Sequence, residues 1–281
     1  MCWVNIKGVD GISWPDDAFL LSPLPFYLRR ETKILQMNKF PLETIGEDSE
    51  IWFRDCFSVR YIQSAALLCR LGYAIEKDYA KAGQISPEAL LSHEAFILNS
   101  ILSSVAFLES AVNELYSDAA DISSLSADEK NGAVLQKIRE QWTNEKNFDR
   151  APLLTKYQKI LSFANKPPFA ETDPAFLNVK NLIEIRNFLM HYRREWVVLA
   201  KSRRLRDGHQ TGGFKFEETL KHAFKENPFA HKNRPFFPDK CLGHGCAEWA
   251  VINSLVLTGE FFSRLGLPAP YDGIKNDLLT R

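Results

Sequence analysis

Residues 173–196 read DPAFLNVKNLIEIRNFLMHYRREW, and this stretch is the strongest predictor of the fold. Asp followed by Pro favours a helix start, because the Asp side chain accepts hydrogen bonds from free N–H groups and Pro stands where no N–H is needed. We therefore expect a helix that starts at about Pro174. Alternating spacings of three and four place five residues on one buried side: Leu182, Ile185, Leu189, Tyr192 and Trp196.

The opposite side of this predicted helix is polar. It carries Glu184, Asn187, His191 and Arg194. One interpretation is a solvated face whose side chains find partners one turn away. The other is a row of functional groups, and the helix pattern alone does not separate the two.

Arg186 belongs to neither side. It falls in a second apolar row with Val179, Ile183 and Met190. An ionised guanidinium is costly in such a row unless a counter-charge pairs with it. The ordinary alternative is that Arg186 lays its stem along apolar surface and keeps its charged head in water.

The composition favours a soluble cytoplasmic protein. The chain has 281 residues, 45% of them hydrophobic, which is enough for one large domain or two modest ones. Its formal net charge is zero, so no overall basic field indicates a nucleic-acid partner. Five cysteines without a regular framework fit a reducing compartment. The longest apolar run, 97–108, is interrupted by Ser and Asn and is too short to span a bilayer, so we expect no membrane span. The first residues do not show a basic region followed by an apolar core and a cleavage site, so we expect no signal peptide.

Helical patterns dominate from Glu50 onward. The stretch 51–79 predicts one long helix or two short ones, and Ser86-Pro87-Glu88 is a clear start for the next helix. That helix carries a buried seam of Leu98, Ile101, Val105, Leu108, Val112 and Leu115. Later helices are expected to follow the capping box Ser126-x-x-Glu129 as far as Trp142, to begin at Pro152, and to span 246–265 before Gly266.

The chain therefore predicts a mainly all-α protein with a small irregular or β-containing N-terminal extension. Asp10-Gly11 between two short apolar runs suggests a hairpin in that extension. We expect the extension at 1–48, packed on the bundle, and the helical domain at 49–281, with its core at 86–200 and 241–266 and a basic, aromatic-rich insertion at 201–240.

Two motifs resemble a known family. Arg186-Asn187-Phe188-Leu189-Met190-His191 resembles the R-x(4 to 6)-H motif of the HEPN superfamily of helical ribonucleases and nucleotide-binding domains. Upstream, 107–114 (FLESAVNE) resembles the pattern that HEPN-like bacterial proteins carry before that motif, and 246–250 resembles their closing helix. The resemblance implies a helical bundle of HEPN type over roughly 86–266.

The resemblance also implies chemistry on RNA without a metal or other cofactor. A ribose 2′-hydroxyl attacks its own phosphate and leaves a cyclic phosphate. Such a reaction needs a base, an acid and a cation beside the developing charge. His191 suits either proton role, Arg186 the phosphate, and Asn187 the orientation of the imidazole or a ribose oxygen. Glu109 is expected to be partly buried and to supply the counter-charge for Arg186, either within the site or merely as a tie between helices.

Arg186 and His191 are five residues apart, which is about 140° around a helix, so one helix cannot easily direct both at one phosphate. The family solves this by dimerisation, which implies a homodimer with a composite active site here, with the second apolar row as part of the interface.

A toxin or antiphage effector restrained by an antitoxin or regulatory protein is the role that the resemblance implies. Family members with nucleotidyltransferase antitoxins have a Tyr two places after the His, whereas here Tyr192 is adjacent and position 193 is Arg. The alternatives are a catalytically inactive module that binds nucleotide, RNA or protein, and a purely structural bundle.

Residues 193–240 carry twelve Lys or Arg side chains against six Asp or Glu, with Phe residues interleaved. Such a mixture suits phosphates and unstacked bases. The alternative, of equal weight, is that the Phe side chains cover the bundle. The predicted RNA contacts are Arg193, Arg194, Tyr192, Asn113, Arg203 and Arg204. Cys241, His244 and Cys246 could form a zinc knuckle, but no fourth ligand stands nearby, and no metal is expected.

Overall fold

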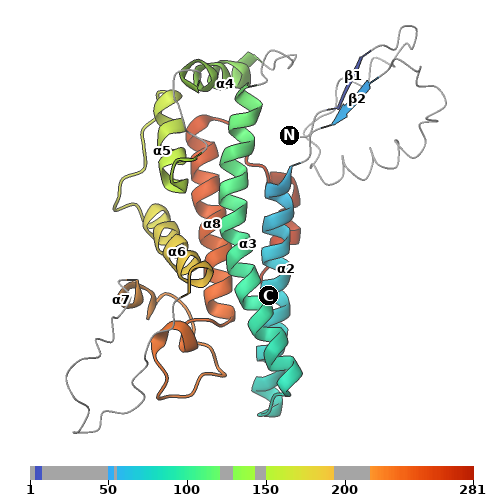
Figure 1. The fold of residues 1–281 in the computed structure, drawn as a ribbon, viewed down its shortest axis with the longest axis vertical. Coiled ribbons are helices and arrows are strands. Elements are labelled where there is room, and N and C mark those ends of the chain that lie inside the picture. Colours follow the sequence, from blue (N-terminus) through green and yellow to red (C-terminus); the bar gives the residue numbers. More distant parts are fainter. Residues whose placement is uncertain (1–3, 8–49, 54–55, 121–128, 143–149, 193–215) are drawn as a thin grey trace, which may run out of the picture.

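The computed structural model describes residues 4–7, 50–53, 56–120, 129–142, 150–192 and 216–281. Of 4–7, 50–53 and the ends of helix α4 it describes only the backbone. The described part is mainly helical (Figure 1). The prediction of an all-α protein is therefore confirmed for these residues.

Three long helices form the centre of the fold. Helix α2 (Phe57–Ala82) and helix α3 (Pro87–Ala120) run antiparallel, joined by a short turn at Gly83, and α8 (His244–Leu265) lies along both (Figure 1). Gly72 lets α2 and α3 approach closely, since a Cβ there would lie 2.6 Å from Ile97 Cδ1. The mid-helix glycine therefore has a packing role that offsets its low helix propensity.

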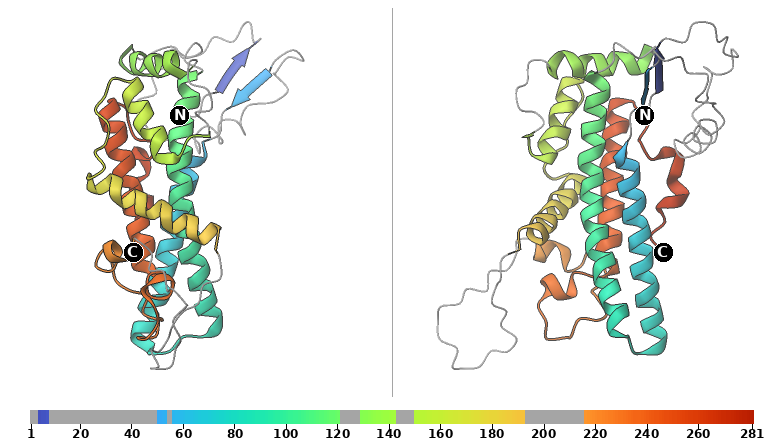
Figure 2. Two further views of the ribbon diagram at one scale, coloured as in Figure 1. Left: turned by 60° about the vertical axis from the view of Figure 1, so that its left-hand side comes forward. Right: turned by 45° about the vertical axis from the view of Figure 1, so that its right-hand side comes forward.

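The remaining helices cover the other side of α3 and α8. Helix α4 (Glu129–Trp142) crosses the end of α3, and α5 (Leu153–Phe163) and α6 (Pro174–Met190) follow along the bundle (Figure 2). Short turns complete the described part: α7 (Glu217–Leu220), a helical turn at Phe236–Lys240 and a closing turn at Asp272–Leu278. The core lies where α2, α3, α5, α6 and α8 meet.

Most predicted helix boundaries are confirmed. Helix α6 begins at Pro174, and α3 begins at Pro87 with the Ser86 hydroxyl accepting from Ala89 N–H at 3.2 Å. Helix α8 ends at Leu265 with Gly266 in the left-handed conformation (φ 75°). The seam of α3 is buried from Ile101 to Leu115, and only Leu98 is half-buried.

Two fold predictions need correction. Residues Glu50–Phe53 form strand β2 rather than helix, which fits their β-branched and aromatic composition. Strand β1 (Val4–Lys7) pairs antiparallel with β2, with Ile6 opposite Ile51. The hairpin predicted at Asp10-Gly11 lies outside the described residues. The spacing of apolar residues within 246–265 also predicts one buried side that carries Trp249, Ile252, Leu255 and Phe262. On α8, however, Ile252 is 46% exposed.

Helix α3 is long and apolar enough, by length and composition, to cross a bilayer. In this fold half of its most apolar window is buried against neighbouring helices. The neighbours that cover the buried half include α2 and α8.

Candidate functional site

The motif helix α6 ends at the predicted functional residues. Its last residue is Met190, and His191 caps it with a backbone N–H that donates to Asn187 O at 2.9 Å. Asn187 and His191 are both exposed. Tyr192 is 58% exposed and packs edge-on against Phe188, with ring centroids 5.2 Å apart. The prediction that Tyr192 continues the buried side is wrong, because the helix ends before it.

Arg186 is half-buried, one turn before this end of the helix. Its Nε atom is buried and has no hydrogen-bond partner in the part of the chain that the structure describes. A buried donor without a partner costs about 1–3 kcal/mol, and more when it is charged. Arg186 therefore carries a hydrogen-bond donor that the described part of the fold leaves unsatisfied.

The second apolar row of α6 is not a continuous surface. Val179 is fully buried in the protomer core, Ile183 is half-buried and Met190 is 59% exposed. The expectation that Val179 contributes to a dimer interface is therefore wrong, because α3 and α8 already cover that side of α6. Of the row, Met190 is the member accessible to a partner.

The expected pair of Glu109 with Arg186 is also wrong. Glu109 is exposed, at 49% of its side chain, and its Oε1 lies 3.9 Å from Lys156 Nζ. Lys156 Nζ also donates to Asn113 Oδ1 at 3.0 Å. No ion pair joins Glu109 to Arg186 among the described residues. Glu109 and Asn113, two residues of the upstream motif, thus contact Lys156 of α5. Asn113 was a predicted RNA contact, but its side chain is already hydrogen-bonded within the protein.

Lys156 is the residue that the sequence interpretation missed. Its side chain is only 2% exposed. It lies in the buried row of α5 with Leu153, Tyr157, Ile160 and Leu161. The sequence did contain a signal for Lys156, because a Lys in an apolar row needs a polar or charged partner, as Arg186 does in α6.

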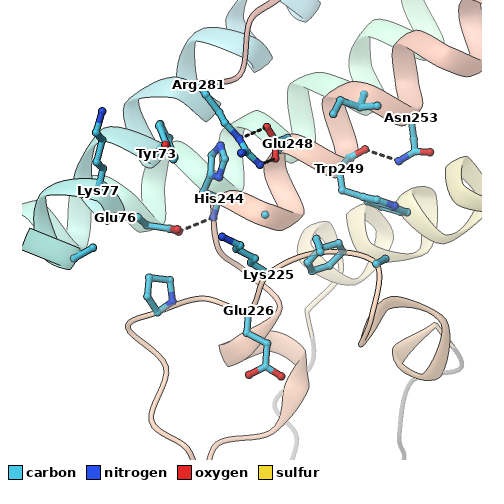
Figure 3. Close-up of a pocket in the computed structure, with 16 residues that line it drawn as sticks. Tyr73, Glu76, Lys77, Lys225, Glu226, His244, Glu248, Trp249, Asn253 and Arg281 are labelled. Carbon is cyan, nitrogen blue, oxygen red and sulfur yellow. Dashed lines mark hydrogen bonds and ion pairs between the residues drawn. The ribbon is translucent and has the colours of Figure 1, made fainter.

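A second polar cluster lies where α8 begins (Figure 3). Glu76 Oε1 accepts from the His244 backbone N–H at 2.7 Å and from His93 Nε2 at 2.8 Å. His93 is fully buried. Glu76 of α2 thereby caps the N-terminus of α8, where free N–H groups favour a carboxylate, and joins α2, α3 and α8.

Glu248, one turn into α8, faces the segment after the closing turn. Arg281 Nε donates to Glu248 Oε1 at 2.8 Å and Arg281 Nη2 donates to Oε2 (Figure 3). The Thr280 hydroxyl also donates to Oε1, at 2.8 Å. Burial acts to raise the pKa of Glu248, but these bonds from Arg281 and Thr280 outweigh it, so the pKa is lower than usual. Arg70 of α2 holds the same segment through the backbone oxygens of Asp277 and Leu279.

The three residues of the zinc alternative do not converge. His244 Nε2 donates to Thr280 O at 3.1 Å, and its ring packs on Tyr73 with centroids 4.8 Å apart. The Cys241 and Cys246 sulfurs lie 3.8 Å apart, and their hydrogen bond and burial raise the pKa of Cys241 well above its usual range. Across the described ranges no group of three His, Cys, Asp or Glu side chains is placed to hold a metal ion.

The basic, aromatic-rich segment is described only from Phe216 onward. The predicted contacts Arg193, Arg194, Arg203 and Arg204 lie outside the described residues. Phe216, Phe236 and Phe237 are buried, and Phe237 packs edge-on against Phe188 of α6 at 4.7 Å. These three rings therefore cover the bundle, as the alternative held, and are not free to stack on bases.

Comparison of the chain with protein-family models, with curated proteins and with solved structures found no match. The function of the protein is therefore inferred from its own residues and their geometry.

Proposed function

We propose that the protein is a metal-independent HEPN-type endoribonuclease that cleaves RNA by attack of a 2′-hydroxyl, leaving a 2′,3′-cyclic phosphate and a free 5′-hydroxyl. One observation supports the proposal most. The open end of α6 combines the exposed imidazole of His191, the exposed amide of Asn187 and the guanidinium of Arg186 with an unpartnered, buried Nε. Each group has a role in that reaction.

The roles follow from the chemistry of the side chains. The His191 imidazole can act as a base that takes the proton of the attacking 2′-hydroxyl, or as an acid that gives one to the leaving 5′-oxygen. The Arg186 guanidinium presents donors in a fixed fork that matches two phosphate oxygens, and so stabilises the negative charge of the phosphorane. Asn187, four residues before His191, orients the imidazole or a ribose oxygen.

The contact of Glu109 with Lys156 favours this role for Arg186. A tie between helices would require a carboxylate beside the guanidinium, and Glu109 lies at Lys156 instead. In this proposal Glu109 and Asn113 have a structural role, since they hold Lys156 and thereby the packing of α5 on α3.

The site is proposed to be shared by two copies of the chain. Arg186 and His191 diverge by about 140° around α6, so a second copy would bring its own α6 to complete the cleft. Met190 and Tyr192, 59% and 58% exposed, are accessible to such a partner. We further propose a cytoplasmic toxin or antiphage effector whose activity a second protein restrains.

A binding module without catalytic activity is the second candidate. It is favoured by the position of His191, which is exposed and whose side chain makes no hydrogen bond or ion pair within the described residues. In this case Arg186 would bind an RNA or nucleotide phosphate, or a protein carboxylate, and no bond would be cleaved. The helical scaffold would be the same.

The test is cleavage of labelled single-stranded RNA in EDTA by the wild type, His191→Ala and Arg186→Ala. The matched control is Lys180→Ala, which removes an exposed charge from the same helix. We expect cyclic-phosphate ends from the wild type and the control, and loss of cleavage in both site variants. Binding without cleavage by a folded wild type, weakened in Arg186→Ala, would identify the binding module. Cleavage that survives in His191→Ala would contradict the proposed mechanism.

A further inference from the structure

Helix α2 carries a regular exposed row on its outward side. It packs on α3, on α8 and on the closing turn at Asp272–Leu278, and within the described residues its remaining side is uncovered (Figure 2). On that side residues recur at alternating spacings of three and four, and all of them are exposed except Arg60, which is half-buried. A repeat of this kind averages 3.5 residues, which is the spacing of helices that pair along their length. We call this set the outer row: Phe57, Arg60, Ser64, Leu67, Leu71, Ala74, Asp78 and Lys81.

The middle of the outer row is apolar. Leu67 is 48% exposed and Leu71 is 39% exposed, and Leu68 and Ile75 lie half-buried along one edge of the row. The neighbouring stretch of α3, 95–108, contains no charged residue. Because no charge lies along this edge, the surface gains free energy when another apolar surface covers it.

The two ends of the outer row carry opposite charges. At one end the Arg60 guanidinium lies over the Phe57 ring, with Cζ 4.9 Å from the ring centroid. At the other end Asp78 Oδ1 lies 3.5 Å from Lys81 Nζ, and these two side chains are 78% and 68% exposed. Such an exposed pair contributes little to stability, so Asp78 can take another partner at little cost. A helix with Arg60 near one end and Asp78 near the other is complementary to a second copy that runs in the opposite direction.

We propose that the outer row is the contact surface of a two-fold homodimer in which the α2 helices of two copies pair antiparallel. When the pairing is centred on position 69, each member of the row lies opposite a complementary one. Leucines meet on either side of the axis, small residues form the next layer, opposite charges form the third, and a cation faces an aromatic ring in the outermost layer. The pairs between one copy and its partner are Leu67 with Leu71, Ser64 with Ala74, Arg60 with Asp78, and Phe57 with Lys81.

Other arrangements of the two helices are unfavourable. A parallel pair places Arg60 beside the partner's Arg60 and Asp78 beside the partner's Asp78, and like charges at an interface cost free energy. An antiparallel pair shifted by one heptad places Leu67 opposite the partner's Asp78, or Leu71 opposite the partner's Arg60. The outer row therefore selects one orientation and one register.

One further cation lies beside the axis. Arg70 borders the outer row on the edge away from Leu68, so the Arg70 residues of the two copies approach each other. Its Nη1 atom donates to Asp277 O at 3.0 Å and to Leu279 O at 2.6 Å. Because its own chain holds the guanidinium toward the closing segment, the repulsion across the axis is reduced.

The interface is separate from the proposed ribonuclease site. Helix α6 lies on the other side of α3 and α8 from α2, so the pairing leaves the end of α6 accessible (Figure 1). The proposal therefore goes beyond the ribonuclease function and does not depend on it.

The test is cross-linking between Ser64→Cys and Ala74→Cys, purified separately, mixed and treated with a short bismaleimide. We expect at least tenfold more cross-linked dimer in the mixture than in either variant alone, because the two Ser64 positions of an antiparallel pair lie about 15 Å apart. The wild-type chain under the same treatment controls for its own cysteines. No cross-link in the mixture, or an equal yield in Ser64→Cys alone, would overturn the proposal.

Further variants, each made in both cysteine proteins, test the leucines and the charges. Leu67→Glu should lower the cross-link yield at least tenfold, whereas Ile252→Glu, which replaces a residue of similar exposure on α8, should leave it unchanged. Arg60→Asp should also lower the yield, and Arg60→Asp/Asp78→Arg should restore it, because the pair forms again with its charges exchanged. An unchanged yield in Leu67→Glu would contradict the interface, and failure of the exchanged pair to restore the yield would contradict the register. His191→Ala should cross-link normally, so this result and that of the ribonuclease test are distinguishable.

Discussion

Lys156 and Arg186 are two basic side chains in the apolar rows of neighbouring helices, and their surroundings differ. Lys156 is 2% exposed, and its ammonium group contacts Asn113 and Glu109. Arg186 is half-buried near the end of α6, and its Nε atom has no partner in the described part of the chain. The same sequence signal thus corresponds to a satisfied charge in one helix and an unsatisfied one in the other.

The difference separates a structural charge from a candidate functional one. A buried charge with its partners in place holds helices together, and removing either partner is destabilising. A charged side chain whose donors lack partners does not hold helices together. Its simplest explanation is that a ligand or partner molecule binds it. The predictions below test whether Lys156 and Arg186 divide in this way.

Arg186→Ala should produce the largest effect, on activity and not on stability. Removing one group that stabilises the transition state costs about 10²–10³ in rate, so we expect RNA cleavage to fall at least about a hundredfold. The free energy of unfolding should change little, because an unsatisfied buried donor is removed along with the charge. Initial rates of cleavage and urea unfolding of the same preparation measure the two effects.

Arg186→Lys is the informative companion. Lys keeps the charge but not the fork that binds two phosphate oxygens, so cleavage should remain well below wild type. A large loss of stability in Arg186→Ala, with cleavage retained, would instead make Arg186 a structural charge like Lys156.

Lys156→Ala should have the opposite effect to Arg186→Ala, since it should lower stability and leave the activity unchanged. Removing this buried side chain leaves a cavity and frees Asn113 Oδ1, and we expect the free energy of unfolding to fall by about 3 kcal/mol. Lys156→Met keeps most of the volume and should lose less. Urea unfolding measures both losses. Cleavage per folded molecule should stay near wild type, and a hundredfold loss in a folded Lys156→Met protein would show that Lys156 acts in the reaction.

The helical fold was predictable because its signals are local. Ser86 before Pro87, Pro174 after Asp173 and Gly266 after α8 each set a helix boundary through backbone chemistry that a sequence displays directly. The strand at Glu50–Phe53 was missed because a run of four residues has no period long enough to distinguish strand from helix.

The contacts of the site were less predictable because they depend on tertiary packing. Sequence spacing placed Glu109 on the right helix but could not show that Lys156 of α5, and not Arg186 of α6, would face it. Glu76 and Glu248 gave no local signal at all. Their partners, His93, the His244 N–H, Thr280 and Arg281, come from segments far apart in the sequence.

Glu248 is a carboxylate whose hydrogen-bond partners are in place, and its charge should have a smaller effect on stability. Its pKa is lower in the folded protein than the usual 4.5, so as the pH falls the unfolded chain takes up a proton more readily than the folded one. The stabilisation is complete above about pH 4.5 and is lost as the pH falls through the lowered folded pKa. We expect no more than about 1 kcal/mol, because solvent screens part of the pair.

Unfolding in urea between pH 3 and pH 7 measures this loss, with Glu248→Gln as the control. The Gln variant should be less stable near pH 7 and should lose less stability on acidification. Equal pH dependence of the two proteins would mean that the bonds from Arg281 and Thr280 are not kept in solution.

Glu109→Gln should have the smallest effect on stability, and it tests which side chain is the main partner of Lys156. Glu109 is 49% exposed and lies 3.9 Å from Lys156 Nζ, so its charge contributes at most a few tenths of a kcal/mol after screening. Asn113→Ala should cost more, about 1–2 kcal/mol, because it removes the 3.0 Å hydrogen bond to the same buried ammonium group. Urea unfolding of both variants, and of the double variant, gives the two costs and their coupling.

A different ranking would change the assignment of Glu109. If Glu109→Gln costs more than Asn113→Ala, the carboxylate is the main partner of Lys156 and the pair is closer in solution than 3.9 Å. If Glu109→Gln leaves stability unchanged but lowers cleavage about tenfold or more, its exposed carboxylate acts on RNA, and the upstream motif belongs to the reaction as well as to the packing of α5. If both are unchanged, Asn113 alone satisfies Lys156, and the contrast with the unpartnered Arg186 rests on one hydrogen bond.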